Sequence, residues 1–116
     1  MTSSSLIYKI LPASSWQDAQ ERGAFSGAGV DIADGYIHFS TKEQVRETAA
    51  KHFAGQCDLV LLAVDGSMLA SSKLKWEVSR GGALFPHLYG TLDLKAVRWA
   101  KPLPWDGAQH VFPELA

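Results

Sequence analysis

The chain has 116 residues, of which 47% are hydrophobic and 20% are charged, as is usual for a globular domain. Eleven basic and twelve acidic residues leave a formal net charge of -1, so bulk charge gives no reason to expect nucleic-acid or membrane binding. Cys57 is the only cysteine, which excludes an intrachain disulfide and favours a reducing cytoplasm. We expect one cytoplasmic domain over residues 1–116, frayed at residues 1–5 and at the extreme C-terminus.

The chain begins with a predicted strand followed by a helix. Residues 6–11 are apolar, include a tyrosine and two isoleucines and end at Pro12, a pattern typical of a strand. Residues 16–22 then predict a helix of about two turns with Ser14 or Ser15 as its N-cap.

A glycine-containing loop and a second helix are expected next. Residues 25–34 hold glycines and two aspartates, which predicts a loop able to approach a ligand closely. After a short strand over residues 36–39, Ser40 and Glu43 have the spacing of a capping box, with Ser40 as N-cap. The helix is therefore predicted over residues 41–53.

The second half of the chain predicts mainly strands. Residues 59–64 form a continuous apolar run, which indicates a strand buried on both faces. Residues 97–100 predict a last strand stopped by Pro102, and residues 105–116 an irregular tail that covers the domain. Five or six short strands and two helices, both helices in the first half, favour an α+β fold with a mixed or mostly antiparallel sheet. We expect both helices on one side of that sheet.

Residues 74–90 concentrate groups able to do chemistry. They predict two short strands joined by residues 79–83. Side chains alternate across a strand, so Leu74, Trp76 and Val78 are expected on the core face and Glu77 on the opposite face.

The same alternation applies to residues 36–40 and 84–89. If the three strands share a sheet, their second faces form one polar and aromatic surface, whereas a register slip of one residue would destroy it. The residues of this surface would be Tyr36, His38, Ser40, Glu77, His87 and Tyr89. Arg80, beside two glycines in the connecting loop, is expected to bind an anion or to be solvated.

Each of these groups also has a structural interpretation. Glu77 alone would more often be an exposed carboxylate paired with Lys75 or Arg80, and His87 a packed histidine with one hydrogen bond. Two histidines and a glutamate suit iron or zinc, but no H-x-H, H-x-x-x-H or C-x-x-C element occurs here. We therefore expect no metal.

Four segments resemble a family of small bacterial proteins catalogued as domain of unknown function nine-fifty-two. The segments are IYKI, DGYIHFST, LKWEVSRGG and FPHLYG, and the resemblance covers nearly the whole chain. It implies the ADP-ribosyltransferase-like fold, a split α+β sheet whose cleft binds NAD in the active relatives. The family itself has no established activity.

The resemblance also implies roles for particular residues. Breaking a nicotinamide–ribose bond passes through a cation-like sugar, which a carboxylate such as Glu77 would stabilise. Tyr36 or Tyr89 would be the stacking ring, and His38 or His87 the positioning group.

Two features depart from the active relatives. Those relatives usually carry a histidine or arginine on the first strand, where this chain has Tyr8 and Lys9. Their glutamate also comes late in the chain, whereas Glu77 precedes His87.

The first hypothesis is a cleft for a nucleotide-like small molecule, for which NAD is one candidate. Its expected catalytic residues are Glu77, His38 and His87, and its expected ligand-binding residues are Tyr36, Ser40, Arg80 and Tyr89. The rival is a non-catalytic sensing or interaction module in which the same residues form a structural network, so enzyme activity stays open. We expect a monomer or weak homodimer.

Overall fold

The computed structural model describes residues 6–78 and 82–115 and has an α+β fold. The strands in chain order are β1 (Leu6–Pro12), β2 (Ala24–Phe25), β3 (Ile37–His38), β4 (Leu59–Asp65), β5 (Leu74–Val78), β6 (Leu84–Leu88), β7 (Leu92–Asp93) and β8 (Val97–Leu103). The α-helices are α1 (Ala13–Arg22), α2 (Val30–Asp34) and α3 (Val45–His52). Short 3-10 turns follow β4, at Gly66–Met68, and β7, at Leu94–Ala96. The described part thus has more strands than expected, and α2 lies where a loop was predicted.

The strands of the described residues form three separate sheets. One sheet has the order β1-β4-β8, a second the order β3-β6-β5, and β2 pairs with β7. Every one of these pairings is antiparallel, which confirms the mostly antiparallel prediction. An isolated bridge between Tyr8 and Ser40 connects β1 to the chain just after β3. The two larger sheets therefore meet at this bridge, as the halves of a split sheet.

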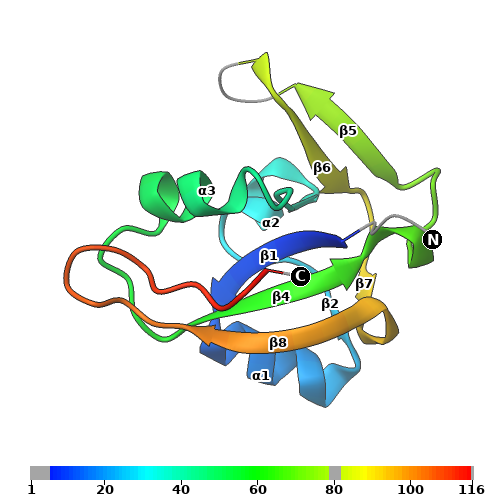
Figure 1. The fold of residues 1–116 in the computed structure, drawn as a ribbon. Coiled ribbons are helices and arrows are strands. Elements are labelled where there is room, and N and C mark those ends of the chain that lie inside the picture. The colour runs from blue at the N-terminus through cyan, green and yellow to red at the C-terminus, as the bar shows by residue number, and fades with distance from the viewer. Residues whose placement is uncertain (1–5, 79–81, 116) are drawn as a thin grey trace.

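Helices α1 and α3 cover opposite faces of the β1-β4-β8 sheet (Figure 1). Along β1, Ile7 and Leu11 belong to the apolar cluster that includes residues of α1. Tyr8 and Ile10 belong to the cluster that includes residues of α3. The expectation that the helices share one side is wrong, because the central strand β4 is buried on both faces and each face needs its own cover.

The predicted capping box at Ser40 does not form. The Ser40 backbone N–H and carbonyl both bond to Tyr8, and the Ser40 hydroxyl lies 2.9 Å from the Thr48 hydroxyl. The Thr41 N–H instead donates to Gln44 Oε1 at 3.0 Å, and α3 begins only at Val45. The helix is shorter than predicted because pairing with β1 holds Ser40 in a strand-like bridge.

The apolar face of the β5–β6 hairpin is only partly buried. Leu74 and Leu88, at its base, pack on the core, but Trp76, Val78 and Leu84 are 48%, 69% and 50% exposed. The prediction that Trp76 and Val78 are core residues is therefore wrong. These side chains are exposed because the hairpin extends beyond the sheets and helices that cover its base, as Figure 1 shows.

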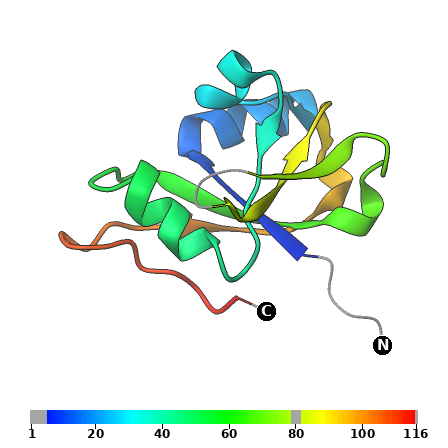
Figure 2. The ribbon, with the colours of Figure 1, turned by 90° about the horizontal axis from the view of Figure 1, so that it is seen from above.

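The C-terminal tail covers the α3 side of the domain, as expected (Figure 2). Strand β8 continues past the predicted stop at Pro102, which an edge strand tolerates. Beyond it, His110 is buried with Nε2 3.0 Å from the Gln56 carbonyl oxygen, and Leu115 packs in the cluster with Val45. Over the described ranges, no helix has the length and apolar character needed to cross a membrane.

Candidate functional site

The register of the β3-β6-β5 sheet brings the predicted aromatic and polar side chains together on one face. His38 pairs with His87 across β3 and β6. The Tyr36 ring stacks on His87 with 4.3 Å between centroids, and lies 4.5 Å from the His38 ring and 5.0 Å from the Tyr89 ring. Strand alternation therefore predicted this surface correctly.

The Glu77 carboxylate is bonded through one oxygen and open at the other. Its Oε1 lies 2.8 Å from His87 Nδ1 and accepts a hydrogen bond of 2.7 Å from the Tyr89 hydroxyl. No described residue donates to Oε2, and the side chain is 39% exposed. The bonds from His87 and Tyr89 lower the pKa of Glu77, so the group is a carboxylate at neutral pH.

His87 and Tyr89 hold that carboxylate in place. His87 is 3% exposed, and its ring is fixed between the Glu77 oxygen and the stacked Tyr36 ring. The hydrogen bond to Glu77 raises the pKa of Tyr89 to about 12, so its phenol remains a donor at neutral pH. The two residues thus orient Glu77 and keep its charge.

A second, buried carboxylate was missed by the sequence interpretation. Asp31 of α2 accepts from the Lys9 ammonium at 2.8 and 3.0 Å, and from the backbone N–H groups of Ala28 and His38. Burial alone would raise the pKa of Asp31, but the His38 hydrogen bond and the Lys9 charge outweigh it and hold the pKa at about 2. Burial also lowers the pKa of Lys9, while its pairing with Asp31 opposes that shift.

His38 lies between two carboxylates. Its Nδ1 is 2.6 Å from Asp31 Oδ1, and its Nε2 is 2.9 Å from Asp34 Oδ2. Each ring nitrogen thus lies within hydrogen-bonding distance of a carboxylate oxygen, and the two carboxylates fix the orientation of the ring. The signal that could have found this arrangement is the D-x-x-D spacing of Asp31 and Asp34 shortly before His38, on one turn of a helix.

Gly27 allows the loop before α2 to approach Asp31. Its φ of +115° is strained for residues with a side chain, and an added Cβ would lie 3.0 Å from the Asp31 Cβ. The loop of residues 25–34 was expected to approach a ligand closely through its glycines. Gly27 instead lets the backbone approach Asp31, a carboxylate of the protein itself.

A cavity of about 610 Å³ opens beside these groups. Its lining residues come from β1, the start of α2, α3 and the β3–β6 pair, and include Lys9, Gly29, Asp34, His38, Ser40, Thr48, Phe53, Phe85 and His87. Of the predicted ligand-binding residues, Ser40 lines this cavity. Tyr36, Glu77 and Tyr89 are not among its lining residues, but Tyr36 and Glu77 contact His87, which lines it. Arg80 is outside the described residues.

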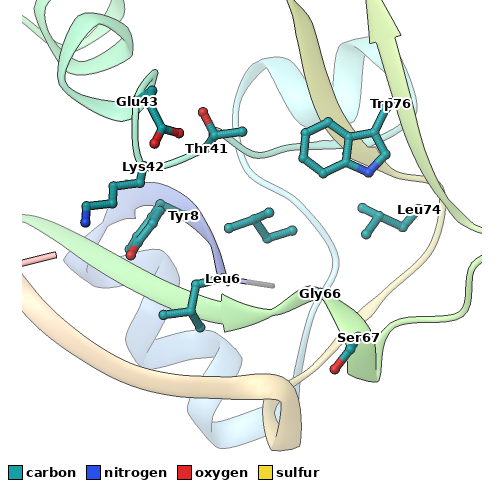
Figure 3. A pocket seen from close by; sticks show the side chains of 10 residues that line it. Leu6, Tyr8, Thr41, Lys42, Glu43, Gly66, Ser67, Leu74 and Trp76 are labelled. Atoms are coloured by element: carbon teal, nitrogen blue, oxygen red, sulfur yellow. The ribbon is translucent and has the colours of Figure 1, made fainter. Parts of the chain in front are cut away.

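A second cavity, of about 590 Å³, lies on the opposite face of the hairpin (Figure 3). Leu6, Leu74 and Trp76 form its apolar part, and no predicted site residue lines it. Within the described residues, no group of three or more His, Cys, Asp or Glu side chains is placed to hold a metal ion.

The chain is similar to one bacterial protein of known structure. The crystal structure of protein CC0527 from Caulobacter crescentus is 51% identical, with a TM-score of 0.86 over 90% of this chain and 91% of that one. The solution NMR structure of CC0527, also 51% identical, matches with a TM-score of 0.80 over 91% of this chain and 90% of that one. No curated protein matches the sequence.

The family comparison agrees with the segments that first suggested a relationship. The family model described as "Protein of unknown function (DUF952)" matches residues 10–100, a range that contains Asp31, His38, Glu77, His87 and Tyr89. The chain therefore belongs to the DUF952 family of proteins of unknown function.

Proposed function

We propose that the cavity lined by His87, the hydrogen-bonding partner of Glu77, binds a nucleotide-like small molecule of the NAD type, within an ADP-ribosyltransferase-like arrangement of two half-sheets. The observation that carries this proposal is the Glu77 carboxylate, whose Oε1 is bonded to His87 and Tyr89 and whose Oε2 has no donor among the described residues. An ionised, oriented carboxylate with a free oxygen is suited to accept a hydrogen bond from a ribose hydroxyl.

The split between the sheets supports the same proposal. The β1-β4-β8 and β3-β6-β5 sheets meet at the Tyr8–Ser40 bridge, and the cavity of about 610 Å³ opens at this junction. Its size lies within the range of small-molecule sites, roughly 300–1,000 Å³. Phe39, Phe53 and Phe85 supply apolar surface for a ring, and Ser40, Thr48 and Gln56 supply polar groups.

The chemistry of the cluster suits the stabilisation of a cation-like sugar. As the glycosidic bond to a leaving base lengthens, positive charge develops on the ribose, and a nearby carboxylate stabilises it. Glu77 would stabilise this positive charge, while His87 and Tyr89 hold the Glu77 carboxylate in position. In this proposal His38, whose ring is fixed by Asp31 and Asp34, is a positioning group in the wall of the cavity.

Lys9 has a different role from the first-strand histidine or arginine of the active relatives. It lines the cavity from β1, but its ammonium is bound by both oxygens of Asp31. We therefore assign Lys9 to the support of the site and not to ligand contact.

The test is a thermal-shift titration with NAD, ADP-ribose and nicotinamide, on the wild type and on Glu77→Gln. A ligand at about 100 times its dissociation constant adds about 2.7 kcal/mol, which raises the melting midpoint of a domain of this size by several degrees. We expect a shift in the wild type that Glu77→Gln largely removes. Glu47→Gln is the matched control, because Glu47 is an exposed residue of α3 paired only with Lys51.

The same variants separate ligand binding from a purely structural network. In the binding proposal, Glu77→Gln changes the free energy of unfolding by less than about 1 kcal/mol, because Glu77 is partly exposed and glutamine retains an acceptor. A structural network would lose roughly 1–3 kcal/mol. The absence of a shift with all three compounds would remove the proposal, and release of nicotinamide from NAD would extend it to turnover.

A further inference from the structure

The outer edge of β5 is an open sheet edge with apolar side chains. In the described part of the chain β5 pairs with β6 on one side and with no strand on the other, as Figure 1 shows. The exposed side chains of Trp76, Val78 and Leu84 gather on one face of this hairpin. Exposed edges of this kind favour pairing with another strand unless they are blocked.

Another edge strand, β8, offers a contrast. Strand β8 is also an edge strand, but it carries Pro102 and the charged residues Arg98 and Lys101, which oppose pairing. Strand β5 has no proline, and its charged residues are one of each sign, Lys75 and Glu77. The two edges therefore differ in the features that prevent strand addition.

The hydrogen-bond pattern shows which backbone groups of β5 point outward. The Tyr89 N–H donates to the Lys73 carbonyl, so by antiparallel alternation Lys75 and Glu77 also bond to β6. The backbone groups of Leu74, Trp76 and Val78 then point to the open edge. The Leu74 N–H confirms this direction, because it donates to the Ala70 carbonyl and not to β6.

We propose that β5 pairs antiparallel with β5 of a second copy of this chain, centred on Trp76. In this register each Trp76 N–H donates to the Trp76 carbonyl of the second copy, and each Val78 N–H donates to the Leu74 carbonyl of the second copy. Only residues whose backbone groups point outward can exchange these bonds, so shifts by an odd number of residues are excluded.

Charge complementarity selects this register among the remaining ones. Centred on Trp76, the pairing places Lys75 opposite Glu77 of the second copy, twice by symmetry. Centring on Lys75 would place the two Lys75 side chains opposite each other, and centring on Glu77 would do the same for the two carboxylates. Like charges directly opposite are destabilising, whereas opposite charges stabilise a strand pair.

The same pairing covers the exposed apolar face. Trp76 packs beside Trp76 of the second copy, and Leu74 beside Val78, so the apolar rows of the two hairpins become continuous. In Figure 3 the Trp76 ring stands over the cavity that Leu6 and Leu74 line, which extends this apolar face. Because the strand is only five residues long, we expect a weak dimer, with a dissociation constant on the order of 10 μM to 1 mM.

The first experiment is sedimentation velocity of the wild type from about 1 μM to 1 mM, the span of the expected dissociation constant. We expect a reversible monomer–dimer equilibrium. Trp76→Pro should abolish the dimer while leaving β5 paired with β6, because the Trp76 N–H faces away from β6. Trp76→Thr keeps that N–H and should weaken the dimer less. A wild type that is monomeric throughout, or a dimer that Trp76→Pro leaves intact, overturns the proposal.

A charge-exchange pair tests the register. Lys75→Glu and Glu77→Lys should each be monomeric, because each places like charges opposite one another, and an equimolar mixture should form a heterodimer. Lys95→Glu makes the same charge change at an exposed position away from β5 and should leave the wild-type dimer intact. Circular dichroism establishes that each variant is folded. Failure of two folded variants to associate when mixed, in conditions where the wild type dimerises, would overturn the register.

Discussion

The carboxylates of Asp31 and Glu77 each bond to a histidine, yet their surroundings differ. The Asp31 side chain is 1% exposed, and both of its oxygens accept hydrogen bonds, from Lys9, His38 and the loop before α2. The Glu77 side chain is 39% exposed, and among the described residues it accepts hydrogen bonds only through Oε1. The saturated carboxylate joins β1, α2 and β3, whereas the open one can still accept a ligand. The number of unbonded acceptor atoms, more than the charge, therefore separates a structural carboxylate from a candidate site.

The largest effect is expected from Asp31→Asn. Removing this charge leaves the Lys9 ammonium buried without a counter-ion, and breaking a buried pair costs roughly 3–5 kcal/mol. Urea unfolding of the variant and the wild type measures the loss. Lys9→Met in the same chain should recover part of it, because the double variant has no buried unpaired charge.

The control for this prediction is Asp34→Asn. Asp34 bonds to the same histidine from an exposed position, so its loss should cost only about 0–1 kcal/mol. If the two substitutions cost the same, the comparison between buried and exposed carboxylates around His38 is mistaken.

A smaller loss in the free energy of unfolding is expected when the wild type is brought to acidic pH. Asp31 has a pKa of about 2 in the folded protein, below the ordinary aspartate value of 3.8, so its contribution to stability is present above about pH 4. That contribution is lost as the pH falls through about 2, because the folded state must then bind the proton. The shift corresponds to about 2 kcal/mol, at 1.36 kcal/mol for each pKa unit.

The acid prediction is checked by comparing unfolding free energies of the wild type and Asp31→Asn between about pH 5 and pH 2. The difference between the two proteins should narrow as the pH falls, because the wild type loses a contribution that the variant lacks. A difference that stays constant would show that other carboxylates control the acid response.

The sequence predicted those parts of the fold whose patterns are local. Alternation in residues 36–40, 74–78 and 84–89 correctly placed Tyr36, His38, Glu77, His87 and Tyr89 on one face, because the period of a strand follows from the chain itself and the observed register keeps the faces aligned. The apolar run of β4 likewise predicted a strand buried on both sides. The predictions that failed depend on how the elements pack together. The sequence did not show how far the core extends along the β5–β6 hairpin, and Trp76 lies beyond it and is exposed.

The candidate site shows the same limit. Glu77, His87 and Tyr89 were found because they alternate on adjacent strands, whereas Asp31 was missed because its charged partner Lys9 is distant in sequence. Lys9 is 22 residues from Asp31, and no local period connects β1 to α2. The Ser40 capping box failed for a related reason, since the Tyr8 bridge holds the Ser40 backbone. Local patterns predict elements and faces, but they do not predict contacts between elements.

The smallest change in stability is expected from Glu77→Gln. The effect of this substitution on the Glu77 carboxylate can be followed through the pKa of Tyr89. The Glu77 carboxylate raises the pKa of Tyr89 to about 12, so Tyr89 contributes to stability below about pH 10 and loses that contribution as the pH rises through about 12. Glutamine keeps an acceptor but removes the charge, so the pKa of Tyr89 should fall toward 10. Ultraviolet titration of the tyrosinates measures this fall, and Tyr89→Phe identifies which transition belongs to Tyr89. Asp31→Asn thus changes the free energy of unfolding at neutral pH, whereas Glu77→Gln changes a titration in alkali. An unchanged Tyr89 transition in Glu77→Gln would mean that Tyr89 does not hold Glu77. The Glu77 carboxylate would then lack the orientation on which the proposed ligand contact depends.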